Sequence, residues 1–205
     1  MSYTFFATIS RMKYIERWAL MRNSRQENLS EHSLEVAMIA HALCTIGNVR
    51  FGKSLDASRA ALIGLYHDAS EIITGDMPTP VKYYNNDIKD AYKQVEHVAE
   101  EKLLMKLPDD LRDEYEDIFL FDEEKITSEE DKANEIYMRK LVKAADKLSA
   151  FIKCLEEENS GNREFRTAKE TIFSNLSEMS EKLPEVKEFM NDFLDSYGKT
   201  LDELT

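Results

Sequence analysis

Apolar residues recur at intervals of three and four along most of this chain, which is the spacing of one face of an α-helix. Between residues 3 and 19 the apolar positions are Phe5, Ile9, Met12 and Ile15. The same spacing recurs to the C-terminal end of the chain, whereas alternating runs of β-branched and aromatic residues hardly occur. The pattern therefore predicts an all-α fold.

Helix start and stop signals predict where these elements lie. After a polar connection over residues 23 to 28, Ser30 and Glu31 are expected to open a second helix that ends at Gly47 and Asn48, and Asp56 to cap a third that runs to Thr74. The prolines of GDMPTP, residues 75 to 80, predict a stiff loop. Further helices are expected over 87–106, from Pro108 onward, and over 136–158, 168–179 and 186–197. The acidic stretch from 113 to 135 is expected to be a solvated hairpin or an exposed helix face.

Composition narrows the class of protein. The chain has 205 residues, of which 42% are hydrophobic and only ten are Gly or Pro, so a single helical domain over 1–205 with one sizeable core is expected. The net charge of −13 disfavours nucleic-acid polymers and anionic membranes as partners. An anionic ligand would need a local attraction, which a divalent cation supplies.

Cysteine usage and the N-terminus bear on the compartment. Cys44 and Cys154 match no metal-binding or redox spacing, so both are expected to be buried, reduced thiols. The N-terminal residues lack the uninterrupted apolar core of a signal peptide, and no stretch reaches the roughly 18 apolar residues needed to span a bilayer. We expect a cytoplasmic protein.

The stretch LYHDASEIITGD, residues 65 to 76, holds three polar groups in an apolar run. On a continuous helix His67, Asp68 and Glu71 would project at about 0°, 100° and 40°, within one sector. A hydrogen-bonded core histidine beside a salt-bridged aspartate is the ordinary explanation of such a pair. His32 near the start of its own predicted helix, and Asp146 within LVKAADKLSAFI, favour another: three helices could bring two imidazoles and two carboxylates together.

Such a mixed set of nitrogen and oxygen donors suits Mn, Co, Fe, Ni or Zn better than Ca, and it differs from a thiolate-rich structural zinc site. The identity of the metal stays open. Four protein ligands around an octahedral ion would leave two positions, which suits metal-assisted hydrolysis.

The order of these residues carries a family resemblance. His32, His67-Asp68 and Asp146 on successive helices resemble the pattern of the HD-domain phosphohydrolase superfamily. The stretches ISRMKYIERWALMRNSRQENLSEHSLEVAMIAHAL, LYHDASEIITGDMPTPVKYYN and KAADKLSAFIKCLEEENSGNREF closely resemble the bacterial 5′-deoxynucleotidases of the YfbR-like type. The resemblance runs from about Phe5 to Ala168, and only the acidic segment of about 114–135 matches poorly.

The resemblance implies a helical homodimer that removes the 5′-phosphate from deoxyribonucleoside monophosphates with one divalent metal ion, such as Co, Mn, Zn, Ni, Fe or Mg. It implies a metal site made by His32, His67, Asp68 and Asp146, three of which, His32, Asp68 and Asp146, would also contact substrate. Glu71 is expected to handle the proton of the attacking water.

The resemblance also implies the substrate contacts. Arg17 would orient the phosphate, and its planar guanidinium fork suits two phosphate oxygens in a way that Lys does not. Trp18 would contribute to sugar discrimination as a wall at the 2′ position. The loop Asp76, Met77, Pro78 and Thr79 would bind the nucleoside, with Asp76 accepting from the 3′-hydroxyl. By position alone, Glu71 could equally be an exposed helix charge or a hydrogen-bond partner of a ligand histidine. By position alone, core packing is the preferred explanation of Trp18, and a turn is the preferred explanation of Asp76.

Two other functions share parts of this pattern. The same ligands could serve hydrolysis of another nucleotide, such as a nucleotide pyrophosphate or a signalling nucleotide. The chain could also be a nucleotide-sensing module without turnover.

Overall fold

The regular structure of the chain is helical. The computed structural model describes residues 2–82 and 84–205, apart from the side chains of Thr79 and Pro80. Within this part of the chain, the extended backbone forms one isolated antiparallel bridge, between Glu16 and Asn28. The prediction of an all-α fold is confirmed.

Internal contacts divide the described residues into two compact units, each assembled from separate segments. Unit 1 comprises residues of 1–20, 26–33 and 66–125, and unit 2 comprises 21–25, 34–65 and 126–205. The poorly matching acidic segment, 114–135, is shared between them. A single domain over 1–205 stays a prediction.

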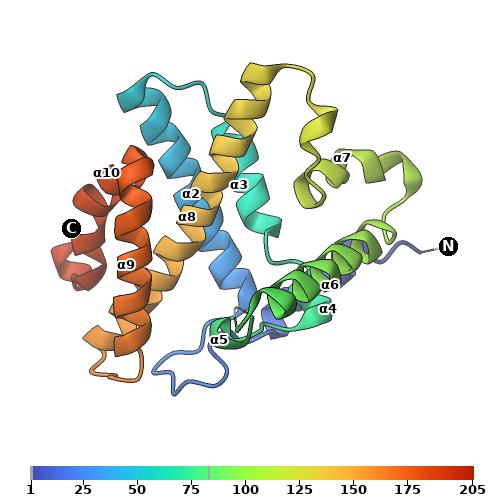
Figure 1. Cartoon of the computed structure of the whole chain (residues 1–205). Coiled ribbons are helices and arrows are strands. Elements are labelled where there is room, and N and C mark those ends of the chain that lie inside the picture. The colour runs from blue at the N-terminus through green and yellow to red at the C-terminus, as the bar shows by residue number, and fades with distance from the viewer. Residues whose placement is uncertain (1, 83) are drawn as a thin grey trace. The chain divides into compact units, whose positions relative to one another are not determined.

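Unit 1 is built from short helices and one long one. It contains α1 (Phe5–Ile9), the 3-10 helix η1 (Ser10–Tyr14), α4 (Glu71–Thr74), α5 (Thr79–Lys82), α6 (Asn86–Leu104), α7 (Asp109–Phe119) and η2 (Glu123–Lys125). Figure 1 shows α4 alongside α6, the long green helix. The core is a cluster of buried side chains, Phe5, Met12, Leu29, Ala69, Leu103, Leu104 and Leu107. This core anchors the segment around Ala69, which carries the HD pair.

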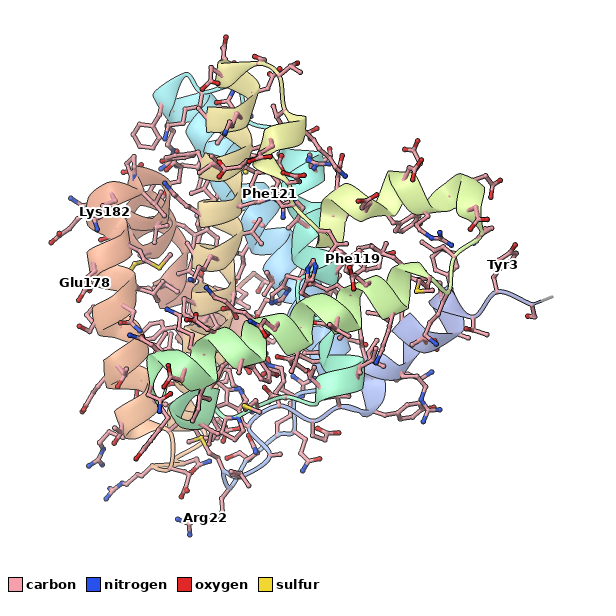
Figure 2. All side chains as sticks on the ribbon, turned by 45° about the vertical axis from the view of Figure 1, so that its right-hand side comes forward. Tyr3, Arg22, Phe119, Phe121, Glu178 and Lys182 are labelled. Atoms are coloured by element: carbon pink, nitrogen blue, oxygen red, sulfur yellow. The ribbon has the colours of Figure 1, made fainter. Side chains whose placement is uncertain are left out.

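Aromatic rings extend that core. The Phe5 ring lies 5.3 Å from the Tyr115 ring and 6.1 Å from the Phe119 ring, both in edge-to-face geometry. Phe119, at the end of α7, is labelled in Figure 2. Tyr66, directly before His67, lies 5.6 Å from the Phe119 ring, so the same aromatic cluster also holds the start of the HD turn.

Unit 2 is made of longer helices. It holds most of α2 (Leu29–Phe51) and of α3 (Ala57–Tyr66), together with α8 (Glu129–Asn159), α9 (Arg166–Lys182), α10 (Pro184–Phe193), η3 (Leu194–Gly198) and η4 (Leu201–Glu203). Helices α8 and α9 run side by side in Figure 1, and Glu178 and Lys182 project outward from α9 in Figure 2. Both cysteines are buried thiols, as predicted, and burial, with Glu185 and Asp56 nearby, raises the pKa of the Cys44 thiol to about 12.

Helix α2 is, among the described residues, the one helix long and apolar enough to cross a membrane by length and composition alone. Its Val36, Ala40 and Leu43 are fully buried in the core of unit 2, and 44% of its most apolar window is buried inside the protein. Core packing therefore accounts for the buried part of the apolar surface of α2.

The predicted ends of α2 were wrong at both sides. The cap is Asn28, whose Oδ1 accepts from the backbone N–H groups of Ser30 and Glu31 at 3.0 and 3.1 Å. The helix also continues through Gly47 to Phe51. A Cβ at Gly47 would lie 2.8 Å from Glu185 Oε1, so this glycine permits a close approach, and Gly52, at φ +63°, follows the helix end instead.

The prediction of a single third helix from 56 to 74 was also wrong. Asp56 caps it as predicted, since its Oδ1 accepts from the Arg59 N–H at 2.9 Å, but α3 ends at Tyr66. Residues 67–70 form tight turns, with Ala69 N–H donating to Tyr66 O and Glu71 N–H to Asp68 O at 2.9 and 3.0 Å. These turns, and not a continuous helical face, orient the HD pair.

The remaining boundaries differ more modestly. Helices α6, α9 and α10 lie within a few residues of their predictions. Helix α8 begins seven residues earlier than expected, at Glu129, where Ser128 caps it by accepting from the Asp131 N–H at 3.3 Å. The helix predicted over 3–19 consists of α1 and η1 and ends at Tyr14, so Arg17 and Trp18 lie in a turn.

Candidate active site

Two imidazoles and one carboxylate converge in unit 1. His32 lies in the first turn of α2 and is fully buried, while His67 and Asp68 open the turn after α3. Asp68 Oδ2 is 3.0 Å from His67 Nε2 and 3.6 Å from His32 Nε2. One potential ligand atom of each residue lies within 4.8 Å of the other two. This mixed nitrogen and oxygen donor set fits a divalent transition metal.

Local structure explains this convergence. His32 follows the Asn28 cap by one turn, and its backbone N–H donates to Asn28 O at 3.2 Å. Ala69, fully buried in the core of unit 1, fixes the turn that presents His67 and Asp68. Each donor is therefore held by a helix start or a core contact next to it in the sequence.

Glu71 is a buried acid next to this group. It begins α4, has an exposed fraction of 6%, and its Oε2 has no hydrogen-bond donor among the described residues. The pKa of this carboxyl is raised to about 9, chiefly by burial and also by the nearby Asp68 and Asp76, although Arg17 and Lys82 act to lower it. A buried, strongly perturbed carboxyl beside potential metal ligands is suited to proton transfer.

The Arg17 side chain reaches the His32, His67 and Asp68 group. Its NH1 lies 3.4 Å from Asp68 Oδ2, and its Nε donates to Glu27 Oε2 at 3.1 Å. Trp18 Nε1 donates to the same Glu27 oxygen, also at 3.1 Å. The structure thus brings the predicted phosphate-binding arginine to the predicted metal-binding aspartate.

Glu27 was not predicted from the sequence. It is buried, and it reaches residues ten and nine positions earlier because the Glu16–Asn28 bridge pairs the two segments antiparallel. Neither periodicity nor a spacing rule covers such a pairing across a turn. The one sequence signal was an acid directly before the Asn28 cap in an otherwise basic stretch.

Asp76 also belongs to this neighbourhood. It follows Gly75, which adopts φ +76° after α4. Burial raises the pKa of Asp76, Arg17 and the backbone N–H of Trp18 lower it, and Asp68 raises it. Met77 and Pro78 are half-buried, and the side chain of Thr79 lies outside the described residues, so the substrate contacts of this loop stay predictions.

Asp146 lies in unit 2, in the middle of α8. Lys147 Nζ approaches its Oδ2 at 3.0 Å. The other three predicted ligands belong to unit 1, so the place of Asp146 in the ligand set stays a prediction.

The fold matches those of known HD proteins. An HD-domain phosphohydrolase from Listeria innocua superposes with a TM-score of 0.76 at 21% identity, covering 95% of this chain and 88% of that one. An HD phosphohydrolase of cyanophage S-2L, solved with dA and one catalytic Zn²⁺ ion, superposes with a TM-score of 0.63 at 19% identity, covering 98% and 100%. These likenesses show that the chain has the fold of HD-domain phosphohydrolases.

The sequence comparisons define the family. Residues 4–197 match the model of the 5′-deoxynucleotidase YfbR-like family. A 5′-deoxynucleotidase of Klebsiella pneumoniae is 48% identical over 201 residues, which cover 98% of this chain and 95% of that protein. The chain belongs to the YfbR-like 5′-deoxynucleotidase family, and the predicted family, enzyme class and activity are confirmed.

Proposed function

We propose that this chain hydrolyses the 5′-phosphate of deoxyribonucleoside 5′-monophosphates at the group formed by His32, His67, Asp68, Glu71 and Arg17. The observation that carries the proposal is the convergence of the three donors with Arg17 on Asp68 Oδ2, beside a buried acid. The name of the Klebsiella relative and the dA bound to the cyanophage protein support the same substrate class.

His32, His67 and Asp68 would hold one divalent ion, with Asp146 as the fourth ligand. Such an ion supplies charge neutralisation at a phosphoryl oxygen and lowers the pKa of water. Co, Mn, Zn, Ni, Fe and Mg are all compatible with this donor set, and metal analysis has to distinguish them.

Arg17 would bind the phosphate. Since its Nε donates to Glu27, the terminal nitrogens are the donors that face the Asp68 side of the site. A guanidinium fork can hold two phosphate oxygens and fix the angle at which the nucleophile approaches.

Glu71 would transfer the proton. Its carboxylate would take a proton from the attacking water as the new P–O bond forms, and would return that proton to the 5′-oxygen of the nucleoside as the P–O5′ bond breaks. Arg17 and Lys82 favour the carboxylate form, and Lys82 is itself held by Glu96 at 2.6 Å. Burial excludes competing water from this carboxyl.

Sugar selection would come from exclusion. The indole of Trp18, adjacent to Arg17 in the sequence, would close the space at the 2′ position, and Asp76 would accept from the 3′-hydroxyl. A ribose would then present a hydroxyl that clashes or stays unsatisfied. Met77, Pro78 and Thr79 would complete the nucleoside-binding loop.

We also propose that the protein is a cytoplasmic homodimer and that its ligand is a small nucleotide. The support is the family resemblance for the dimer, and the net charge of −13 against polymeric nucleic acid and anionic membranes.

The test pairs metal analysis of the wild-type protein and Asp68→Ala with phosphate release from a panel of deoxy- and ribonucleoside monophosphates. We expect stoichiometric metal only in the wild type, and release that prefers the deoxy substrates. No release with any divalent metal would refute the proposal. At least tenfold faster turnover of a nucleotide pyrophosphate or signalling nucleotide would assign that substrate instead, and tight binding without product would assign a sensor.

A further inference from the structure

We propose that Glu27 is a positioning residue that holds the phosphate-binding Arg17 and the sugar-selecting Trp18 as one rigid unit through a single carboxylate oxygen. This inference rests on the proposed roles of Arg17 and Trp18, and adds the residue on which both depend.

One oxygen of the buried Glu27 carboxylate accepts hydrogen bonds from two side chains. Its Oε2 accepts from Arg17 Nε and from Trp18 Nε1, each at 3.1 Å, and its exposed fraction is 8%. The Arg17 side chain is 11% exposed. A carboxylate that is withdrawn from water and bonded to a guanidinium forms strong, charge-assisted bonds, so it restricts both donors together.

The backbone fixes Glu27 relative to its two partners. Arg17 N–H donates to Glu27 O at 2.9 Å, and Leu29 N–H donates to Ile15 O at 2.9 Å, one on each side of the Glu16–Asn28 bridge. Leu29 is fully buried in the core of unit 1. The side-chain contacts therefore start from two segments that are already paired and anchored.

The backbone of Trp18 is strained in a way that needs such anchors. Trp18 is the one residue other than glycine with a positive φ, +56°, among the described residues. A bulky side chain rarely adopts this conformation, which persists only where its surroundings over-determine it. Glu27 holds the indole and Asp76 accepts from the backbone N–H, so the strain is held at both ends of the residue.

The same contacts set the plane of the arginine. The guanidinium is planar, and it is held at Nε by Glu27 and approached at NH1 by Asp68 at 3.4 Å. Two contacts at separate nitrogens fix the orientation of the whole group. Loss of the Glu27 carboxylate would remove the acceptor at Arg17 Nε and the acceptor of the Trp18 indole N–H at the same time.

Three variants separate this role from simple stabilisation. Glu27→Leu removes both carboxylate oxygens, and Glu27→Gln keeps one neutral acceptor oxygen. Glu116→Gln is the control, since Glu116 is another carboxylate of unit 1 in an ion pair, with Lys125 at 2.9 Å. The readouts are kcat and KM for a deoxy- and a ribonucleoside monophosphate, with metal content as a check of site assembly.

We expect Glu27→Leu to lower kcat/KM for the deoxy substrate by about 10- to 100-fold, through a raised KM, and to reduce the ratio of deoxy to ribo activity. Glu27→Gln should fall between this variant and the wild type, and Glu116→Gln should match the wild type. A merely structural role would lower the melting temperature and the active fraction, and would leave KM and the deoxy-to-ribo ratio unchanged.

Trp18 is the only tryptophan, so its fluorescence reports on the same contact without turnover. Collisional quenching by acrylamide should increase in the order wild type, Glu27→Gln, Glu27→Leu, and stay at the wild-type level in Glu116→Gln. Wild-type selectivity and wild-type quenching in folded Glu27→Leu would overturn the proposal.

If Glu27→Leu does not fold, Glu27→Gln decides: a change of about threefold or more in the deoxy-to-ribo ratio supports the proposal, and an unchanged ratio overturns it. If the wild type releases no phosphate from any nucleotide, the proposed function fails, and the quenching series still decides whether Glu27 holds Trp18.

Discussion

A buried ion pair near the C-terminal end of α8 gives a prediction whose size follows from the structure. Glu157, with an exposed fraction of 1%, pairs with Lys153, one turn earlier and also buried. Its Oε2 accepts from the Ser24 backbone N–H at 2.8 Å and from Asn162 Nδ2 at 2.7 Å, while Lys153 also donates to Arg25 O. The pair therefore ties the segment 21–25 to α8 within unit 2.

The ion pair contributes strongly to the free energy of unfolding. Burial raises the pKa of Glu157, but the bonds from Lys153, Ser24 and Asn162 outweigh burial and lower it from 4.5 to about 2, which corresponds to about 3 kcal/mol of unfolding free energy at neutral pH. Removal of one partner of a buried pair costs about 3–5 kcal/mol in general. We expect Glu157→Gln to lose about 3 kcal/mol, because it leaves the Lys153 ammonium buried without a counter-charge.

The contribution of Glu157 to stability depends on pH. A depressed carboxyl pKa stabilises the folded state above pH 4.5, and this contribution is lost as the pH falls from 4.5 towards 2. Urea unfolding of wild type and Glu157→Gln at pH 7, 4.5 and 3 should show the difference between them shrinking below pH 4.5.

The neighbouring Glu158 provides the control, since it is more than half exposed and pairs with Lys169 at the surface. Glu158→Gln should change the unfolding free energy by less than about 1 kcal/mol. A loss below 1 kcal/mol in Glu157→Gln, or an equal loss in both variants, would refute the assignment.

Three further predictions concern the site. Glu71→Gln should lower kcat by about 100- to 10,000-fold. In chelator-treated protein, Glu71→Gln should also raise the free energy of unfolding at pH 8 but not at pH 4. The reason is that the pKa of Glu71 rises from 4.5 in the unfolded state to about 9 in the folded state, so the wild-type protein loses stability as the pH increases between those values. Equal urea-unfolding curves at pH 8 would contradict this. Asp68→Asn should bind less metal by elemental analysis, and full occupancy would exclude Asp68 as a ligand. Arg17→Lys should lower kcat/KM by about 10-fold or more, since Lys cannot form the bidentate contact, and an unchanged value would argue against a phosphate role.

Much of the fold was predictable because helical periodicity is a local signal. Apolar spacing located α6, α9 and α10 to within a few residues, and Asp56 capped α3 as expected. The errors fell where a distant contact overrode a local preference. Gly47 looked like a helix end, yet it lies inside α2, where a Cβ would come within 2.8 Å of Glu185 Oε1.

The site shows the same division. The residue types in LYHDASEIITGD, with His32, predicted the donor set, and the structure brings His32, His67 and Asp68 together. The way they meet was not predictable, since the break at 67–70 replaces the expected helical face. Glu27 escaped prediction because its partners are reached across an antiparallel bridge.

The sequence by itself determined the helical class, the family and the chemical identity of the site residues, because each depends on residue type and spacing along the chain. Only the tertiary structure decided that Arg17 reaches Asp68, that Trp18 is held at a positive φ, and that Glu71 is buried deeply enough to raise its pKa to about 9. Orientation and desolvation arise from contacts between segments that are distant in sequence, which no local pattern encodes.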